Sequence, residues 1–343
     1  MVRMLGREWS REDLLSRVGD LSQLAGVRMI EWADGNARGL RAADIRTGSG
    51  LVYTVLLDRG MDIGPASYGG TGLAFVSPTG FAHPAYYEPQ GAGWLRTFGG
   101  GLMVGCGLTN VGNASEDDGE SLGVHGRLSL LPAQRIAAGE EWDGDACRLW
   151  VRGEMRQVRF FGENLCLERT ISSWLGENRI IVRDRVENLG SAPSPLMILY
   201  HINLGFPLLD EGCRLEAAPH PVEPRDADAA PGLGDWMRMA PPQAGYREQV
   251  FYHDLTADSD GWASIALVNP GLALRLSVRF TKSSLPNLVQ WKQMGRGAYV
   301  LGLEPANCHV EGRAAERERG TLLFLQPGEG RDHQVEIAIE EED

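Results

Sequence analysis

The chain has 343 residues, of which 43% are hydrophobic and 23% charged, so it can bury a large core without covalent staples. Its formal net charge of −13 disfavours nucleic acid and anionic membranes as partners, because both repel a negative surface. The five cysteines are odd in number and lack CxxC spacing, which argues against a disulfide framework and a zinc ribbon.

The first predicted element is a short helix. Ser10 and Asp13 have the spacing of a capping box, and apolar residues follow from Leu14. We therefore predict an N-terminal helical extension over residues 1–22. This segment lacks the apolar core of a signal peptide, and no later apolar run approaches the ~20 residues of a membrane span. A cytoplasmic location is the simplest expectation.

The rest of the chain alternates apolar and polar residues with a period of two, which indicates half-buried antiparallel strands. Residues 272–280 are a clear example, with these residues expected on the inward face: Leu272, Leu274, Leu276, Val278 and Phe280. Turns rich in glycine and proline separate such runs. We predict one all-β domain over residues 1–343, a large antiparallel β-sandwich in which residues 218–248 form a long loop excursion.

Two polar residues stand at the ends of apolar runs predicted to be strands. His201 follows the run "LMILY", and Glu304 follows "AYVLGL". Pro305 biases Glu304 toward an extended backbone and is expected to stop the ladder. An imidazole and a carboxylate can move protons in opposite directions, so the two form a candidate acid–base pair. The alternatives are a satisfied core histidine and a strand-terminal glutamate in water.

The remaining histidines divide by their surroundings. Glycines around "VH" leave room for a ligand beside His125, and His253 precedes Asp254. His220 and His333 are expected at the surface. Histidine and glutamate are ligand types for zinc or manganese, but the candidates lack the short spacing of local metal motifs. We therefore predict neither a metal nor a cofactor.

Three motifs occur in this order: "GVHGRLS", "YHINLGF" and "QWKQMGRGAYVLGLEPAN". Together they resemble the galactose-mutarotase-like (aldose 1-epimerase) superfamily over roughly residues 45–340, and most closely a bacterial branch catalogued as a domain of unknown function. The resemblance implies a supersandwich fold. It also implies that His125 binds substrate, that His201 is the general acid on the ring oxygen, and that Glu304 is the base on the anomeric hydroxyl.

The chain departs from the family pattern at two points. Only Ile202 separates His201 from the Asn203–Leu204 pair, and Asn110 in "GCGLTNVG" is not preceded by the family's arginine. The candidates to replace that cation are Arg59, Arg96 and Lys292. The predicted substrate-binding set is His125, Arg59, Arg96, Asn110, Asn203, His253, Asp254, Trp291 and Lys292.

The resemblance implies a cofactor-free sugar epimerase or mutarotase acting on a small-molecule carbohydrate. Oligomeric state stays open, with a homodimer as one option. One alternative is a metal-dependent sugar isomerase or lyase that uses His125, His201 and His253. Another is a non-catalytic carbohydrate-binding protein, because a fold does not determine a function. A pure binder needs neither a proton donor nor a proton acceptor, so the histidine–glutamate pair favours catalysis.

Overall fold

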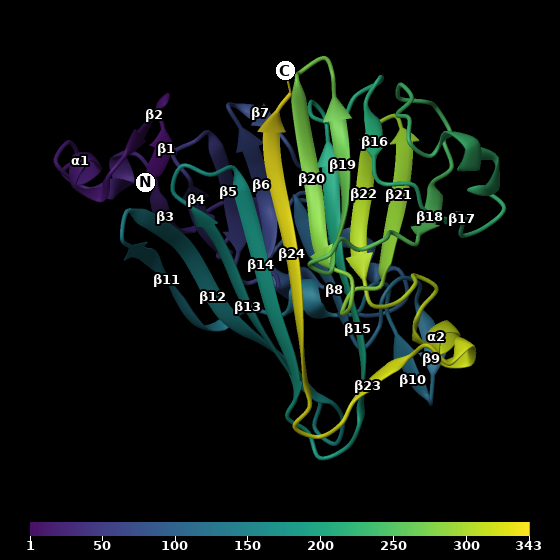
Figure 1. Cartoon of the computed structure of the whole chain (residues 1–343). Helices are drawn as coiled ribbons and strands as arrows, with labels where there is room; N and C mark the ends of the chain where they lie inside the picture. Colours follow the sequence, from purple (N-terminus) through teal and green to yellow (C-terminus); the bar gives the residue numbers. More distant parts are fainter. Residues whose placement is uncertain (343) are drawn as a thin grey trace.

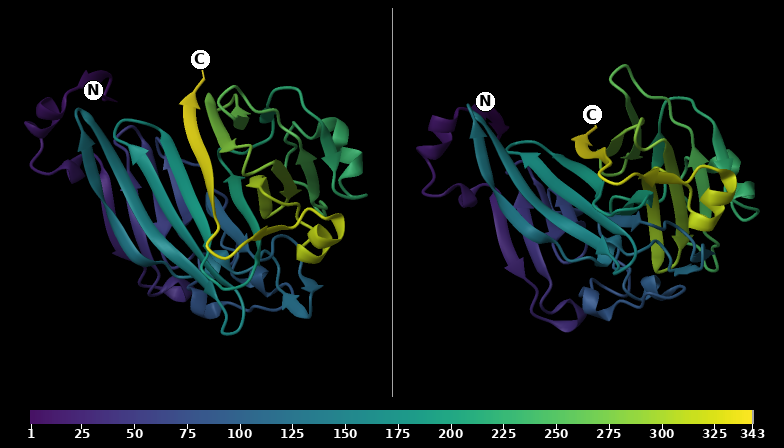
Figure 2. Two further views of the ribbon diagram at one scale, coloured as in Figure 1. Left: turned by 60° about the horizontal axis from the view of Figure 1, so that its bottom comes forward. Right: turned by 90° about the horizontal axis from the view of Figure 1, so that it is seen from below.

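The computed structural model describes residues 1–342, which form two β-sheets packed face to face (Figure 1). Neighbouring strands in both sheets run antiparallel, so the predicted all-β sandwich is confirmed. Figure 2 shows the same layers from other sides, with the first strands (purple) and the strands around residues 250–300 (green) at opposite ends of the molecule. No helix among the described residues is long and apolar enough to cross a membrane.

The smaller sheet has eight strands. In spatial order these are β11 (Gln134–Asp143), β12 (Ala146–Val158), β13 (Asn164–Trp174), β14 (Arg179–Asn188), β24 (Gly330–Glu341), β20 (Leu274–Thr281), β19 (Trp262–Asn269) and β16 (Arg214–Glu216). Its inner face alternates as the sequence predicts, because Leu274, Leu276, Val278 and Phe280 are all buried. Leu272 is 39% exposed, contrary to the prediction, because β20 begins two residues later.

The larger sheet has twelve strands. Its main path is β17 (Val222–Pro224), β18 (Gln249–His253), β21 (Asn287–Gly295), β22 (Ala298–Ala306), β15 (Ser194–Gly205), β8 (Met103–Leu108), β6 (Asp62–Tyr68), β5 (Leu51–Leu56), β4 (Arg41–Arg46) and β3 (Gly26–Glu31), while β23 (Leu323–Leu325) pairs with β15 and β7 (Thr71–Gly72) with β6. The predicted excursion over residues 218–248 follows β16 of the smaller sheet, contributes only the edge strand β17 to the larger sheet, and ends at β18.

The helices are few and short. Ser10 caps α1 (Arg11–Leu15) by accepting a hydrogen bond from the Asp13 backbone, as predicted. A hairpin of β1 (Val2–Met4) and β2 (Arg7–Trp9) precedes α1 and was not expected. The short 3₁₀ helices are η1 (Leu21–Gln23), η2 (Gly35–Ala37), η3 (Pro84–Tyr86), η4 (Gly93–Arg96), η5 (Leu128–Leu130) and η6 (Ala230–Asp235).

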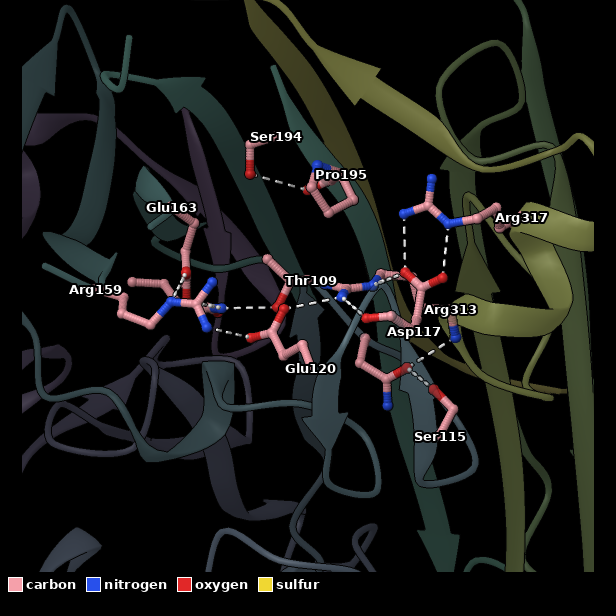
Figure 3. A network of polar contacts seen from close by, with 12 residues as sticks. Thr109, Ser115, Asp117, Glu120, Arg159, Glu163, Ser194, Pro195, Arg313 and Arg317 are labelled. Atoms are coloured by element: carbon pink, nitrogen blue, oxygen red, sulfur yellow. Dashed lines mark hydrogen bonds and ion pairs between the residues drawn. The ribbon is translucent and has the colours of Figure 1, made fainter. Parts of the chain in front are cut away.

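A second helix, α2 (Arg313–Arg319), was also missed. Arg313 and Arg317 both pair with Asp117, at 2.6 Å each, and so fasten α2 to the small hairpin of β9 (Ser115–Asp117) and β10 (Glu120–Leu122) (Figure 3). Gly320 ends α2 in the left-handed conformation that glycine adopts readily.

Strand β15 separates two apolar regions. Ile198, Tyr200 and Ile202 belong to the main core between the two sheets. Met197 and Leu199 belong to a second apolar cluster that contains no strand residue of the smaller sheet. Because successive side chains of a strand point to opposite faces, this cluster lies on the face of the larger sheet that points away from the main core. Loops cover that face, and the candidate site lies among them.

Candidate active site

A cavity of about 250 Å³ opens over β15, β21 and β22, on the face of the second apolar cluster. Its walls are largely apolar and aromatic. The lining residues are Trp94, Leu95, Phe98, Gly112, Asn113, Val124, His125, His201, Arg225, Glu248, Val250, Val289, Trp291, Glu304 and Val310. Four residues predicted from the sequence therefore share this pocket: His125, His201, Trp291 and Glu304.

His201 and Glu304 lie on adjacent strands. Ile202 of β15 pairs with Leu303 of β22, which brings the neighbouring His201 and Glu304 side chains together on one face. His201 Nε2 is 3.3 Å from Glu304 Oε1. The two side chains therefore lie side by side on the floor of the pocket. The strands also continue past both residues, β15 to Gly205 and β22 through Pro305 to Ala306, so the predicted strand ends are misplaced.

Both side chains are buried, with 5% of His201 and 2% of Glu304 exposed, yet neither is satisfied by the protein. His201 Nδ1 has no hydrogen-bond partner. The 3.3 Å approach of Nε2 lacks hydrogen-bond geometry, so Glu304 Oε1 has none either. A buried polar group without a partner costs about 1–3 kcal/mol. A core histidine with satisfied nitrogens would not look like this, so the two groups are free to bind a ligand.

Burial sets the protonation of the pair. Burial, followed by the nearby His125, lowers the pKa of His201 well below its usual value. Burial, followed by the charge of Glu248, raises the pKa of Glu304 well above its usual value, while Arg225 opposes this rise. Both directions favour a neutral imidazole beside a protonated carboxyl. Beyond the N–H of the neutral imidazole, the pair thus holds one titratable proton. An imidazolium beside a carboxylate holds the same number, so the two arrangements differ only in where that proton lies.

His125 is held as a hydrogen-bond donor. It lies in the left-handed region, with φ of 54°, and its Nδ1 accepts a hydrogen bond from the Gly112 backbone at 3.3 Å. Burial lowers the pKa of His125 to about 4, so the ring is neutral and its proton is on Nε2. Its ring packs against Trp94 and His201, with centroids 4.7 and 5.6 Å away. His125 can therefore donate to a ligand at this end of the pocket.

The excursion over residues 218–248 supplies the cation of the pocket. Arg225 pairs with Asp226 at 2.7 Å and with Glu248 at 3.2 Å. Glu248 also accepts a hydrogen bond from Trp291 Nε1 at 2.8 Å. Sequence reasoning missed Arg225 and Glu248, because a polar residue in a segment rich in proline and aspartate reads as solvated surface. The only available signal was that the excursion is long, and long loops often carry function.

Three of the predicted binding residues lie outside the pocket and support the structure instead. Arg59 is buried and donates to the carbonyls of Ala82 and Thr97. Asn110 donates to two backbone carbonyls and accepts from the Arg313 backbone, which holds the start of α2. Asn203 lies on the same face of β15 as His201 and donates to the His201 carbonyl.

The other four predicted residues are also directed elsewhere. Arg96 is exposed and pairs with Glu88. Asp254 pairs with Lys282 at the surface. Lys292 donates to the Asp235 carbonyl. His253 is buried in a hydrogen-bonded chain with His220 and Gln290. His333 is buried as well, contrary to its predicted surface position, because β24 places it on the same face as Val335.

Metal-ligand types meet at one place among the described residues, and it is not this pocket. His309, Glu311 and Glu316 have ligand atoms within 4.8 Å of one another. Arg319 already lies between the two carboxylates, with Nη1 3.0 Å from each. The three histidines of the metal-dependent alternative do not form such a group, because His253 lies outside the pocket that His125 and His201 line.

A two-sheet antiparallel sandwich with a loop-covered pocket on the larger sheet defines the galactose-mutarotase-like class, and solved structures agree. A proposed aldose 1-epimerase from Klebsiella pneumoniae aligns with a TM-score of 0.88 at 25% identity, over 94% of this chain and 86% of that one. A galactose 1-epimerase from Lactobacillus acidophilus NCFM aligns at 0.59 and 14%, over 93% and 100%. A galactose mutarotase-like protein from Clostridium acetobutylicum aligns at 0.63 and 14%, over 93% and 99%.

The chain belongs to the family described as Domain of unknown function (DUF4432), whose model matches residues 37–339. This agrees with the branch that the sequence motifs resemble. No curated protein matches the chain.

Proposed function

We propose that this protein is a cofactor-free mutarotase or related epimerase that interconverts the anomers of a monosaccharide. The observation that carries the proposal is the unsatisfied His201–Glu304 pair at the base of a pocket with aromatic walls. A binding protein would use the free atoms of this pair only as hydrogen-bond partners and would not need them to exchange protons. A proton-transfer site needs both groups free to exchange protons with the ligand.

The chemistry requires one proton to leave the C1 hydroxyl and one to reach the ring oxygen. In the proposed mechanism, hydrogen bonds from the sugar favour the ionised form of Glu304, and the proton of the pair passes to His201. Glu304 then takes the proton of the C1 hydroxyl while His201 protonates the ring oxygen, and the ring opens. Rotation about C1–C2 and the reverse transfers close the other anomer. His125 Nε2–H donates a hydrogen bond that orients the sugar.

The size and lining of the pocket support a single sugar ring as the substrate. The cavity of about 250 Å³ lies just below the usual range of small-molecule sites, about 300–1,000 Å³. Trp291 packs 5.4 Å from the His201 ring and presents an apolar face beside the acid–base pair. Sugar C–H groups pack on such faces.

The decisive experiment measures anomer exchange by NMR across aldoses, ketoses, uronates and keto-sugars, with and without the protein. We expect exchange to accelerate for at least one monosaccharide. The rate should be bell-shaped in pH, because activity requires one proton on the pair: the alkaline limb follows the raised pKa of Glu304 and the acid limb the lowered pKa of His201. Tight binding of a sugar without any acceleration would favour the carbohydrate-binding alternative.

A chelation arm separates the metal-dependent alternative. The proposed proton transfers need no electrophilic ion, so activity should survive exhaustive dialysis against EDTA. Loss of turnover on chelation, restored by adding zinc or manganese, would favour a metal-dependent isomerase or lyase.

A further inference from the structure

Trp291 forms one wall of the pocket, but the sheet supports its ring on one side only. Its cross-strand partners are Val250 of β18 and Gly302 of β22. Val250 is buried in the second apolar cluster, whereas Gly302 has no side chain. A Cβ at Gly302 would touch both Glu304 Oε1 and Trp291 Cβ, so the space above this glycine borders both residues. At this position β22 places no side chain beside the indole.

A carboxylate from the excursion holds the indole instead. Trp291 Nε1 donates to Glu248 Oε2 at 2.8 Å, within the usual range for such a bond. Arg225 Nη2 donates to the other oxygen, Glu248 Oε1, at 3.2 Å, and Arg225 Nε donates to Asp226 at 2.7 Å. Arg225, Glu248 and Trp291 all line the pocket. A hydrogen-bonded connection therefore runs from the excursion to the aromatic wall.

We propose that Glu248 is a positioning residue, which holds the Trp291 indole as a wall of the pocket and away from Glu304. Without this bond the indole turns into the space above Gly302 and covers the Glu304 carboxyl. A sugar then binds only the fraction of molecules in which the indole has moved back, and the apparent affinity falls by that fraction. The part of the inference that concerns sugar rests on the proposed function.

Glu248 also acts on Glu304 through its charge. Burial first and Glu248 second raise the pKa of Glu304, while Arg225 opposes the rise. The other titratable groups beside Glu304 are His201 and Cys106. The pKa of His201 is lowered and that of Cys106 is raised, mainly by burial, so both are uncharged. Loss of the Glu248 charge should lower the pKa of Glu304 and move the alkaline limb of the rate profile to lower pH.

The position of the indole can be tested without a substrate, so this arm does not rest on the proposed function. The Nε1–H NMR signal of Trp291 is assigned as the indole signal that is missing from Trp291→Phe. Its exchange with solvent should be about three- to tenfold faster in Glu248→Met than in the native chain, the effect of one net hydrogen bond. Equal exchange in the two proteins would overturn the proposal.

Glu223→Met is the matched control for this arm. Glu223 is an exposed glutamate of the same excursion, on the edge strand β17, and it does not line the pocket. Exchange of the Trp291 Nε1–H should be the same in Glu223→Met as in the native chain. Faster exchange in both glutamate variants would show that any change in the excursion frees the indole, which contradicts a specific role for Glu248.

The kinetic arm is a double-mutant cycle of Glu248→Met and Trp291→Phe. In the native background, Glu248→Met should raise KM about three- to tenfold. In the Trp291→Phe background the same change should raise KM less than about twofold, because phenylalanine has no N–H for Glu248 to hold. If Glu248 only stabilised the excursion, KM would rise equally in both backgrounds.

The pH profile of kcat separates the charge of Glu248 from its hydrogen bond. The alkaline limb should move to lower pH in Glu248→Met and in the double variant, since both lack the charge. The limb should stay in place in Trp291→Phe, where the carboxylate remains. A limb that moves in Trp291→Phe as far as in Glu248→Met would show that the indole position, and not the charge, sets the proton affinity of Glu304.

Failure of this inference and failure of the proposed function are distinguishable. If indole exchange behaves as expected but no sugar is turned over, the proposed function fails while the positioning of Trp291 by Glu248 stands. If a sugar is turned over but Glu248→Met raises KM equally in both backgrounds, the proposed function stands and the positioning role is wrong.

Discussion

Tyr200 and His201 are neighbours on β15, but their side chains lie on opposite faces of the sheet. The Tyr200 hydroxyl has a hydrogen-bond partner, whereas His201 Nδ1 has none. Tyr200 enters the main core and donates to Asp184 at 2.7 Å. Asp184 is also held by Arg169 at 2.6 Å, and the side chains of both partners are fully buried. His201 enters the pocket, where it and Glu304 are left with unpaired atoms.

The difference separates structural from functional polarity in one strand. Arg169 and Asp184 bring opposite charges into the core and satisfy each other, which is the condition under which buried charge is tolerated. His201 and Glu304 avoid charge by sharing one proton, and they keep free atoms for a ligand. Loss of a partner should therefore unfold the first cluster, whereas the second should lose only its chemistry.

The largest expected effect is on turnover. His201→Ala and Glu304→Gln should each reduce kcat by about 10²- to 10⁴-fold, because each removes one of two coupled proton transfers. The double variant should lose far less than the product of the two, since residues that act as a unit are non-additive. Anomer exchange and melting temperature would be measured on the same samples. A destabilised His201→Ala with normal turnover per folded molecule would contradict the comparison.

In the main core, Arg169→Met should destabilise the fold by about 3–5 kcal/mol, because it leaves the Asp184 charge buried and unpaired. Turnover per folded molecule should be unchanged. The control is Arg185→Met, which removes an exposed pair with Asp332 between β14 and its other neighbour β24 and should cost at most about 1 kcal/mol. Urea unfolding of the three proteins gives the comparison. Equal costs for the two variants would show that the buried pair has no special role.

A smaller effect is expected from Gly302→Ala. A Cβ at Gly302 would collide with Glu304 Oε1 and push the carboxyl away from His201. Misplacement of a reacting group by about 1 Å costs up to about 10²-fold, so kcat should fall about 10- to 100-fold with KM little changed. Gly139→Ala is the control, because its Cβ would meet only Trp150 at 3.9 Å. Unchanged kcat in Gly302→Ala would show that Glu304 has room to relocate without loss.

The smallest effect is a gain in stability. The folded-state pKa of Glu304 is raised, so its contribution is fully present below the unfolded value of about 4.5 and is lost as pH rises through the raised pKa. Glu304→Gln should therefore become more stable relative to the native chain as pH rises above about 4.5. Asp62, whose pKa burial raises to about 7, has the same sign in both proteins and cancels in the difference. A stability difference that does not vary with pH would show that Glu304 is ionised in the folded state.

Sequence patterns predicted the apolar core from alternation and part of the pocket from motifs. Alternation correctly placed Leu274, Leu276, Val278 and Phe280 inward. A period of two along β14 also places Asp184 on the inward face. A carboxylate at an inward position indicates a buried partner, which is Arg169. For the pocket, short motifs predicted His125, His201 and Glu304 together. Strand pairing then places His201 beside Glu304, because β15 pairs with β22.

The rest of the site could not be predicted, because it depends on how loops cover the sheet. Arg225 lies between Pro224 and Asp226 in a polar segment, where nothing in the sequence distinguishes a pocket arginine from a surface one. Arg59 and Lys292 were plausible cations on composition alone, but backbone carbonyls bind both. The contact of His201 with Glu304 required the register of β15 on β22, which the sequence leaves open.

The split of the pocket between strands and excursion has an evolutionary consequence. His201 and Glu304 belong to the sheet, where a one-residue change of register would turn every side chain of the strand to the opposite face. Arg225 and Glu248 belong to a segment that adds only the edge strand β17 to the fold. Under the proposed function, mutations there would alter which sugar binds while the acid–base pair is preserved, since surface loops tolerate insertion and substitution. Relatives built on this sheet would therefore be expected to change substrate specificity before they change the type of reaction.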